Sequence, residues 1–202
     1  MLLMKAGAII LAGGKSSRMG KNKALLPFND KTNIERIRDE LQSLFDDIIL
    51  VTNNPESYEF LNLKSVSDEF PGKGPLAGIH AGLMASDYEE NIVVACDMPF
   101  VSAELASTLV QNLKHFDAIV PVIGGKKHPL FAAYQKRIVP EISTCLTEER
   151  LRVIHLLDNL NVRYLDENDL QVYSDGSLEE IFFNMNVPEE YEEAKQRVEK
   201  GE

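Results

Sequence analysis

The glycine-rich segment near the amino terminus holds the residues best suited to chemistry. Residues 11–23 read LAGGKSSRMGKNK, which places a glycine pair, Arg18 and Lys23 close together. Glycines let backbone N–H groups approach phosphate oxygens, because no Cβ stands in the way. Arginine offers a planar fork for two parallel phosphate contacts, and lysine offers a compact point charge. The segment is therefore typical of a loop that binds phosphate groups.

The charge around this loop contrasts with the charge of the whole chain. The 202 residues include 21 Lys and Arg against 32 Asp and Glu, which gives a net charge of −11. This balance disfavours nucleic acid or an anionic membrane as the main partner. Residues 1–29 nevertheless contain five Lys and Arg and no acidic residue, the first being Asp30. We expect an anionic small-molecule ligand, although a solvated basic loop would carry the same charges.

The spacing excludes two common phosphate-binding loops. The P-loop requires four residues between its glycines, followed by Lys and then Ser or Thr. Here five residues separate Gly14 from Gly20, and Asn22 follows Lys21. The dinucleotide pattern GxGxxG is also absent from this segment. A phosphate site here must therefore use a different arrangement of glycines and cations.

Asp97 is the candidate metal ligand. It directly follows the apolar run 91–96, and Pro99 stands two positions later. The carboxyl end of a buried strand is where open α/β sheets bind ligands. Mg²⁺ typically takes one or two protein carboxylates and completes its octahedron with water and phosphate oxygens. Asp97 therefore fits a Mg²⁺ site, and a helix N-cap is the alternative role.

Asp68 opens a second glycine-rich loop, DEFPGKGPLAG, over residues 68–78. A carboxylate can accept hydrogen bonds from the N1–H and 2-amino groups of guanine together, or from ribose hydroxyls. Gly74, Pro75 and Gly78 would let a base approach the backbone closely. The loop indicates a nucleoside site, unless Asp68 only forms a turn.

Cysteine and histidine usage excludes several other kinds of site. Cys96 and Cys145 are far apart and form no CxxC pair, which argues against zinc or a disulfide framework and suits a reducing cytoplasm. No histidine pairs with a plausible nucleophile, so we reject a triad hydrolase. The chain has no run of about 18 apolar residues and no charged start of a secretory signal. We therefore expect a cytoplasmic protein without a membrane span.

Apolar runs alternate with helical patterns along the chain, which predicts one α/β domain with a mostly parallel sheet and crossover helices. The predicted strands cover residues 6–12, 47–52, 64–67, 91–96, 117–120 and 162–165. The predicted helices cover residues 33–44, 76–85, 103–114, 138–145, 148–157 and a last stretch from Pro188, and a further short helix is predicted between Pro55 and the strand at 64–67. The predicted N-caps are Thr32, completed by Glu35, and Ser102.

The second half of the chain departs from this rhythm. The glycine pair at 124–125 predicts an antiparallel hairpin within residues 121–135. We expect a single domain over residues 1–202, with the nucleotide in about 1–120 and its acceptor in about 121–202.

Residues 11–26, LAGGKSSRMGKNKALL, resemble the signature of the nucleoside-triphosphate transferases, roughly LAGGxSxRMGxxK with a following leucine pair. Within this family the chain is most similar to the molybdenum cofactor guanylyltransferases, and the resemblance extends over about residues 7–193. Later motifs add to it: His128-Pro129 on the hairpin, an arginine at 150 or 152, and an N-x-N-x-P-E motif over 184–189.

The resemblance implies a three-layer, Rossmann-like nucleotidyltransferase fold and a Mg²⁺-dependent transfer of GMP from GTP to the phosphate of molybdopterin. It implies that Arg18, Lys23 and Asp97 act in catalysis, with Asp97 on Mg²⁺. Thr52 falls where the family places a nucleoside-contacting Asn, and Asn53 could replace it. The implied GTP-binding residues are Leu11, Ala12, Gly13, Gly14, Lys23, Thr52, Asn53, Asp68, Gly78 and Asp97, and the implied molybdopterin-binding residues are Asn184 and Asn186.

Other functions remain open at this stage. The first loop recognises a triphosphate rather than a base, so transfer from CTP to molybdopterin, or to a sugar or alcohol phosphate, is the nearest alternative. A non-catalytic nucleotide-binding regulator is an alternative of another class, and the presence of Asp97 counts against it. Because the molybdenum cofactor is labile, we also expect transient handover of the product to other molybdenum-cofactor proteins.

Overall fold

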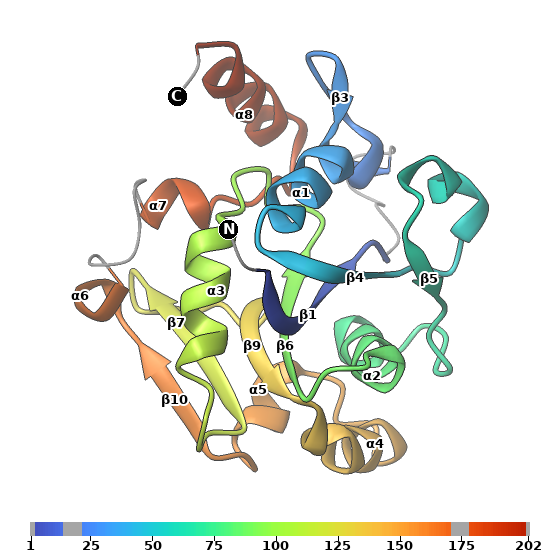
Figure 1. The fold of residues 1–202 in the computed structure, drawn as a ribbon, viewed down its shortest axis with the longest axis vertical. Helices are drawn as coiled ribbons and strands as arrows, with labels where there is room; N and C mark the ends of the chain where they lie inside the picture. Colours follow the sequence, from blue (N-terminus) through green and yellow to red (C-terminus); the bar gives the residue numbers. More distant parts are fainter. Residues whose placement is uncertain (1–2, 14–21, 171–177, 201–202) are drawn as a thin grey trace.

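A single mixed sheet forms the centre of the protein (Figure 1). The computed structural model describes residues 3–13, 22–170 and 178–200. Within these ranges the strands of the sheet run in the order β10-β7-β9-β6-β1-β4-β5, and β8 pairs with β7. Their bounds are β1 (Met4–Leu11), β4 (Phe45–Val51), β5 (Lys64–Val66), β6 (Glu90–Ala95), β7 (Ala118–Ile123), β8 (Lys126–Lys127), β9 (Phe131–Gln135) and β10 (Val162–Leu165). A separate small hairpin joins β2 (Pro27–Phe28) to β3 (Lys31–Thr32).

Most neighbouring strands are parallel. β1 pairs in parallel with β4 and β6, β4 with β5, and β10 with β7. β9 is antiparallel to both of its neighbours, β6 and β7. The predicted mostly parallel sheet with an antiparallel hairpin is therefore confirmed. The chain reverses at Gly124 and Gly125, whose φ angles of 57° and 72° lie in the left-handed region that glycine tolerates.

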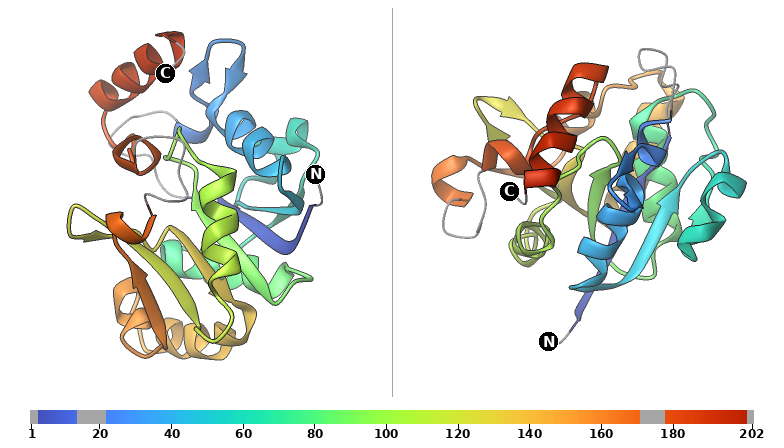
Figure 2. Two further views of the ribbon diagram at one scale, coloured as in Figure 1. Left: turned by 60° about the vertical axis from the view of Figure 1, so that its left-hand side comes forward. Right: turned by 90° about the horizontal axis from the view of Figure 1, so that it is seen from above.

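Helices cover both faces of the sheet, which makes the three layers (Figure 2). Successive residues of a strand point to opposite faces, so Ile9 packs with one helical layer and Ile10 with the other. One layer holds α1 (Asn33–Gln42) and α3 (Ala103–Gln111), and the other holds α2 (Pro75–Ala85), α4 (Val139–Thr147) and α5 (Val153–Leu157). Because both faces are covered, the central strands are continuously apolar. The three-layer expectation is confirmed.

The helix predicted over residues 148–157 is wrong in its first half. Glu149 adopts a left-handed φ of 58° and Arg152 is extended, so the chain cannot continue a helix through them. The described part also contains short elements that the sequence pattern did not predict, because they are too short to show a period. They are the 3₁₀ turns η1 (Lys23–Leu25) and η3 (Lys136–Ile138), and the short helices α6 (Glu167–Leu170) and α7 (Leu178–Ile181). The 3₁₀ turn η2 (Pro55–Leu61) lies where a short helix was predicted.

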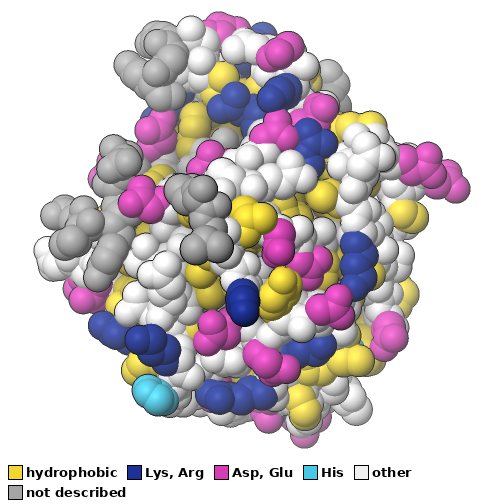
Figure 3. Space-filling view, viewed as in Figure 1, with side chains coloured by type: hydrophobic (Ala, Val, Ile, Leu, Met, Phe, Trp, Pro, Cys, Tyr) yellow, Lys and Arg dark blue, Asp and Glu magenta, His cyan; other side chains and the backbone are white. Residues whose placement is uncertain are grey.

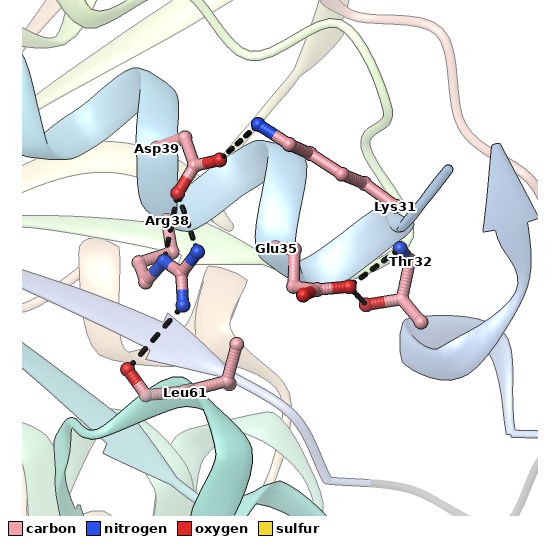
Figure 4. A network of polar contacts seen from close by, with 6 residues as sticks. All are labelled: Lys31, Thr32, Glu35, Arg38, Asp39 and Leu61. Carbon is pink, nitrogen blue, oxygen red and sulfur yellow. Dashed lines mark hydrogen bonds and ion pairs between the residues drawn. The ribbon is translucent and has the colours of Figure 1, made fainter. Parts of the chain in front are cut away.

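The start of α1 is held by a set of charged side chains (Figure 4). The Glu35 carboxylate accepts hydrogen bonds from the Thr32 N–H and hydroxyl, both at 2.7 Å, as the predicted capping box requires. Asp39 pairs with Lys31 at 2.8 Å and with Arg38 at 2.6 Å. Exposed pairs of this kind contribute little stability, so their main effect is to fix the direction in which α1 leaves the hairpin.

The carboxyl terminus returns to the amino-terminal hairpin. The last helix, α8 (Pro188–Lys200), lies beside β2 and β3 in both Figure 1 and Figure 2. Phe28 and Met185 are fully buried between them, and the Tyr191 hydroxyl donates to the Pro27 carbonyl at 2.6 Å. The last helix therefore packs against the hairpin of β2 and β3.

Charged side chains of both signs are mixed over the face shown in Figure 3. In the described part of the chain, every helix is too short or too polar to cross a membrane.

Candidate active site

The ends of three parallel strands meet at one edge of the sheet. The Ala12 N–H donates to Val51 of β4 at 2.9 Å, and the Cys96 N–H donates to Leu11 of β1 at 3.1 Å. This is the edge where open α/β sheets bind ligands. Gly13 is exposed there, and a Cβ added to it would meet no atom of the described residues within 4 Å. Leu11 and Ala12 are thus bonded into the sheet, and Gly13 follows them at the edge where the phosphate site is predicted.

Gly14 and Arg18 fall outside the described residues. Their assignment to the triphosphate therefore stays a prediction.

Lys23 sits on the short turn η1, and its neighbour Asn22 holds that turn. The Asn22 side-chain oxygen accepts from the Ala24 N–H at 3.1 Å, while its amide donates to the Tyr58 hydroxyl at 2.8 Å. Asn22 therefore caps η1 and ties it to η2. The Lys23 ammonium, half-buried, donates to the Asn186 side-chain oxygen at 3.3 Å. The sequence analysis missed Asn22, although an Asn before a short helix is a capping signal.

Asp97 lies at the end of β6, as predicted. One of its carboxylate oxygens, Oδ1, is buried and has no hydrogen-bond partner among the described residues. Burial raises the pKa of this carboxyl, and the positive charge of Lys23 partly offsets the effect. A buried oxygen without a donor is costly unless a ligand meets it. The free oxygen of the Asp97 carboxylate therefore fits a Mg²⁺ ion, which needs only one or two protein carboxylates.

The N-x-N-x-P-E motif over residues 184–189, called the carboxyl-terminal motif from here on, contacts the backbone of Asp97. The Met185 N–H donates to the Asp97 carbonyl at 2.9 Å, and Asn186 contacts Lys23. Glu190 accepts from the backbone N–H groups of Asn186 and Val187, which fixes the turn before α8. The Asn184 amide instead donates to the nearby Phe182 carbonyl at 2.9 Å. The structure thus brings Asn186 to Lys23, whereas Asn184 stabilises its own turn.

Two residues were predicted to compete for the nucleoside contact, and Thr52 is buried whereas Asn53 is exposed. Thr52 is only 2% exposed, and its hydroxyl accepts from the Asn54 N–H at 3.2 Å within its own turn. Asn53 is exposed and pairs reciprocally with Asp68, through contacts of 2.6 and 3.1 Å. Asp68 keeps a buried oxygen without a partner among the described residues. The geometry therefore favours Asn53 with Asp68, rather than Thr52, as the pair that meets a nucleoside.

The loop before α2 turns at glycines. Gly72 and Gly74 have φ angles of 81° and 71°, so other residues would be strained there. Gly78 plays a different part, because a Cβ added to it would lie 3.2 Å from the Leu11 side chain. Its small size lets α2 pack closely against the end of β1. Gly78 thus supports the strand that carries the first loop.

The residues predicted for the acceptor half fall in two places. The half-buried His128 ring lies 4.6 Å from the Phe182 ring, next to the carboxyl-terminal motif. Burial lowers the pKa of His128, and the Lys126 charge adds to this. Arg150 instead pairs with Glu148 at 2.8 Å, and Arg152 is exposed at the start of α5. Of these residues the structure places only His128 beside the motif that reaches Lys23.

An open α/β sheet that carries a cationic turn and a buried carboxylate at the same strand ends defines a protein of the nucleotidyltransferase class. The chain belongs to the MobA-like NTP transferase family, whose family model matches residues 8–161. The resemblance found in the first loop is thereby confirmed.

Named relatives agree with this family. The chain is 36% identical over 193 residues to a probable molybdenum cofactor guanylyltransferase of Pelotomaculum thermopropionicum, covering 96% of this chain and 93% of the relative. It is 39% identical over 183 residues to one of Carboxydothermus hydrogenoformans, covering 91% of each. The crystal structure of molybdopterin-guanine dinucleotide biosynthesis protein A from Archaeoglobus fulgidus superposes with a TM-score of 0.84 at 26% identity, over 96% of this chain and 99% of that one.

Proposed function

We propose that this protein transfers GMP from GTP to the phosphate of molybdopterin, forming the guanine dinucleotide cofactor and pyrophosphate. One observation carries the proposal: the carboxyl-terminal motif contacts both Lys23 and the peptide of Asp97. A second substrate bound by that motif would lie next to the phosphates held by the first loop. The family and the names of the relatives support GTP and molybdopterin as the two substrates.

The transfer needs no covalent enzyme intermediate. An oxygen of the molybdopterin phosphate would form a bond to the α-phosphorus of GTP, while the bond from that phosphorus to pyrophosphate breaks. A phosphate monoester is already anionic near neutral pH, so no general base is required. The protein then contributes position and charge neutralisation, which dominate phosphoryl transfer.

The described residues divide this work among them. Lys23 would neutralise charge on the triphosphate, and the backbone of Leu11, Ala12 and Gly13 would line it. Asn53 and Asp68 would orient the nucleoside through amide and carboxylate groups. Asp97 would hold Mg²⁺, which supplies further neutralisation of the phosphate oxygens when bound.

Pyrophosphate release tests the proposal. Each of GTP, CTP, ATP and UTP is supplied with Mg²⁺, with and without molybdopterin. We expect release with GTP only, and only when molybdopterin is present. Pyrophosphate release with CTP and with no other nucleotide would show that the protein is a cytidylyltransferase instead. Pyrophosphate release from GTP when a sugar or alcohol phosphate replaces molybdopterin would contradict the choice of acceptor.

Two further expectations concern where the protein acts and what receives its product. We expect it to act in the cytoplasm, because the described part of the chain holds Cys96 and Cys145 as free thiols, which suits a reducing compartment. The labile product would also be passed to other molybdenum-cofactor proteins by transient contact.

A further inference from the structure

Asn33 is a polar residue at a core position of α1. It is the first residue of the helix and is 0% exposed, like its neighbour Ile34. Its side-chain amide donates to the Cys96 carbonyl at 2.7 Å, across 63 residues of sequence. Its side-chain oxygen is buried without a partner among the described residues. Burial of an amide with only one group satisfied is a poor way to gain stability, so the hydrogen bond to Cys96 needs another explanation.

The backbone of Asn33 reaches the other half of the phosphate site. Its N–H donates to the Leu26 carbonyl at 2.9 Å, and the Leu26 N–H donates to the Lys23 carbonyl at 3.3 Å. Asn33 therefore joins the turn that carries Lys23 to the peptide that precedes Asp97.

These contacts close into a ring through the carboxyl-terminal motif. The Asp97 carbonyl accepts from Met185 at 2.9 Å, and Asn186 accepts from the Lys23 ammonium at 3.3 Å. Starting at Lys23, the ring therefore passes through Leu26, Asn33, the peptides of Cys96 and Asp97, Met185 and Asn186, and returns to Lys23. Among the described members of this ring, Asn33 is the one that belongs to α1, and it contacts the carbonyl of Cys96, the residue before Asp97.

We propose that Asn33 is a positioning residue, which fixes the Asp97 carboxylate relative to Lys23 through the Cys96 carbonyl. The inference rests on the proposed function, because it assigns Asp97 to Mg²⁺. Asn33 itself touches neither metal nor substrate. Outer-shell groups that hydrogen-bond a metal ligand directly typically change metal affinity by about 10- to 100-fold when removed, and Asn33 acts one peptide further from the carboxylate, so we expect the lower end of that range.

Asn91, on the strand β6 that leads to Asp97, provides a control. It is also 0% exposed, and its amide donates to the Tyr88 carbonyl at 2.9 Å, at the opposite end of β6. Asn33→Ala and Asn91→Ala each remove one buried amide and its hydrogen bond to a carbonyl, and Asn91→Ala also removes the hydrogen bond that the Ser86 hydroxyl donates to the Asn91 side-chain oxygen. Asn33→Leu removes the same amide while keeping the volume of the side chain.

Binding of Mn²⁺ to the full chain without nucleotide, followed by the electron paramagnetic resonance signal of free Mn²⁺, tests the proposal. We expect both Asn33 variants to bind Mn²⁺ roughly tenfold more weakly than the wild type. Asn91→Ala should bind it as the wild type does, although thermal unfolding should show it destabilised. Asp97→Asn marks complete loss of the ligand.

Wild-type Mn²⁺ affinity in the Asn33 variants would overturn the proposal, as would an equal loss in Asn91→Ala. Failure of both Asn33 variants to fold would make Asn33 a structural residue and would overturn it too. Failure of the proposed function has a different signature. The wild type would then bind Mn²⁺ and GTP but release no pyrophosphate with molybdopterin, and the comparison of Mn²⁺ affinity between variants would still be valid.

Discussion

The ammonium of Lys23 donates a hydrogen bond to the side-chain oxygen of Asn186 across 3.3 Å, although 163 residues separate them in the sequence. This contact joins the first loop to the motif before the last helix. The nucleotide-binding and acceptor parts of the proposed site are therefore neighbours in space. A change at Lys23 is expected to affect both, but not equally.

Replacement of Lys23 should weaken triphosphate binding most. Lys23→Ala removes a cation that we assign to the triphosphate, so the loss of affinity should be larger for GTP than for GMP. Isothermal titration with the two nucleotides measures this difference. Lys31→Ala is the matched control, because Lys31 is an exposed lysine that pairs with Asp39. Equal losses for GTP and GMP would remove Lys23 from the triphosphate site.

Replacement of Asp97 should separate activity from stability. Asp97→Asn keeps the size of the side chain but removes the charge, so we expect turnover to fall by about 100-fold or more, as with other essential electrostatic groups. The wild type holds a buried carboxylate oxygen without a described partner, so the variant should unfold at an equal or higher temperature without Mg²⁺. Wild-type turnover in the variant would contradict the metal role of Asp97.

Thr52 and Asn53 should respond differently to substitution. Asn53→Ala removes the amide that pairs with Asp68 at 2.6 Å, and we expect a higher KM for GTP with little loss of stability. Thr52→Val removes a buried hydroxyl that holds a turn, and we expect a loss of about 1 kcal/mol in the free energy of unfolding with little change in KM. Steady-state kinetics and urea unfolding measure the two effects. The opposite pattern would return the nucleoside contact to Thr52.

His128 and Arg150 should also differ. His128 packs against Phe182 beside the carboxyl-terminal motif, so His128→Ala should raise the KM for molybdopterin more than that for GTP. Arg150 is already paired with Glu148, so Arg150→Ala should leave both KM values unchanged. Kinetics with each substrate varied in turn provide the measurement. A molybdopterin effect confined to Arg150→Ala would move the acceptor site to the connection between α4 and α5.

Stability should fall in mild acid because of His80. This histidine is 5% exposed and contacts the Ser143 hydroxyl at 3.0 Å, and burial lowers its pKa below the ordinary value of 6.5. The unfolded chain therefore takes up a proton near that value, while the folded protein does so only at lower pH. The resulting stability is fully present above the unfolded pKa and is lost as the pH falls toward the folded one.

Urea midpoints at about pH 7.5 and about pH 5.5 measure this loss. His80→Gln should show a smaller difference between the two conditions than the wild type. His155→Gln is the control, because His155 is exposed and should leave the difference unchanged. An unchanged difference in His80→Gln would assign the acid sensitivity to other groups.

Local patterns in the sequence determined much of this protein. The apolar runs of β1, β4 and β6 and the caps of α1 and α3 are properties of neighbouring residues, so periodicity and capping rules predicted them. The first loop showed the family, because its glycines and cations lie within thirteen residues. The helix predicted over residues 148–157 was wrong in its first half, because nothing in the local pattern shows that Glu149 is left-handed and Arg152 extended.

Only the tertiary structure decided which distant residues meet. Strand order placed β9 between β6 and β7, and the packing of α8 on the first hairpin brought Asn186 to Lys23. The structure also showed that Asn33, the buried first residue of α1, bonds to the peptide before Asp97. Periodicity describes which face a residue occupies, but the partner on that face depends on how the layers stack. The sequence therefore predicted the chemistry of the loop, whereas the contacts that position the loop followed only from the tertiary structure.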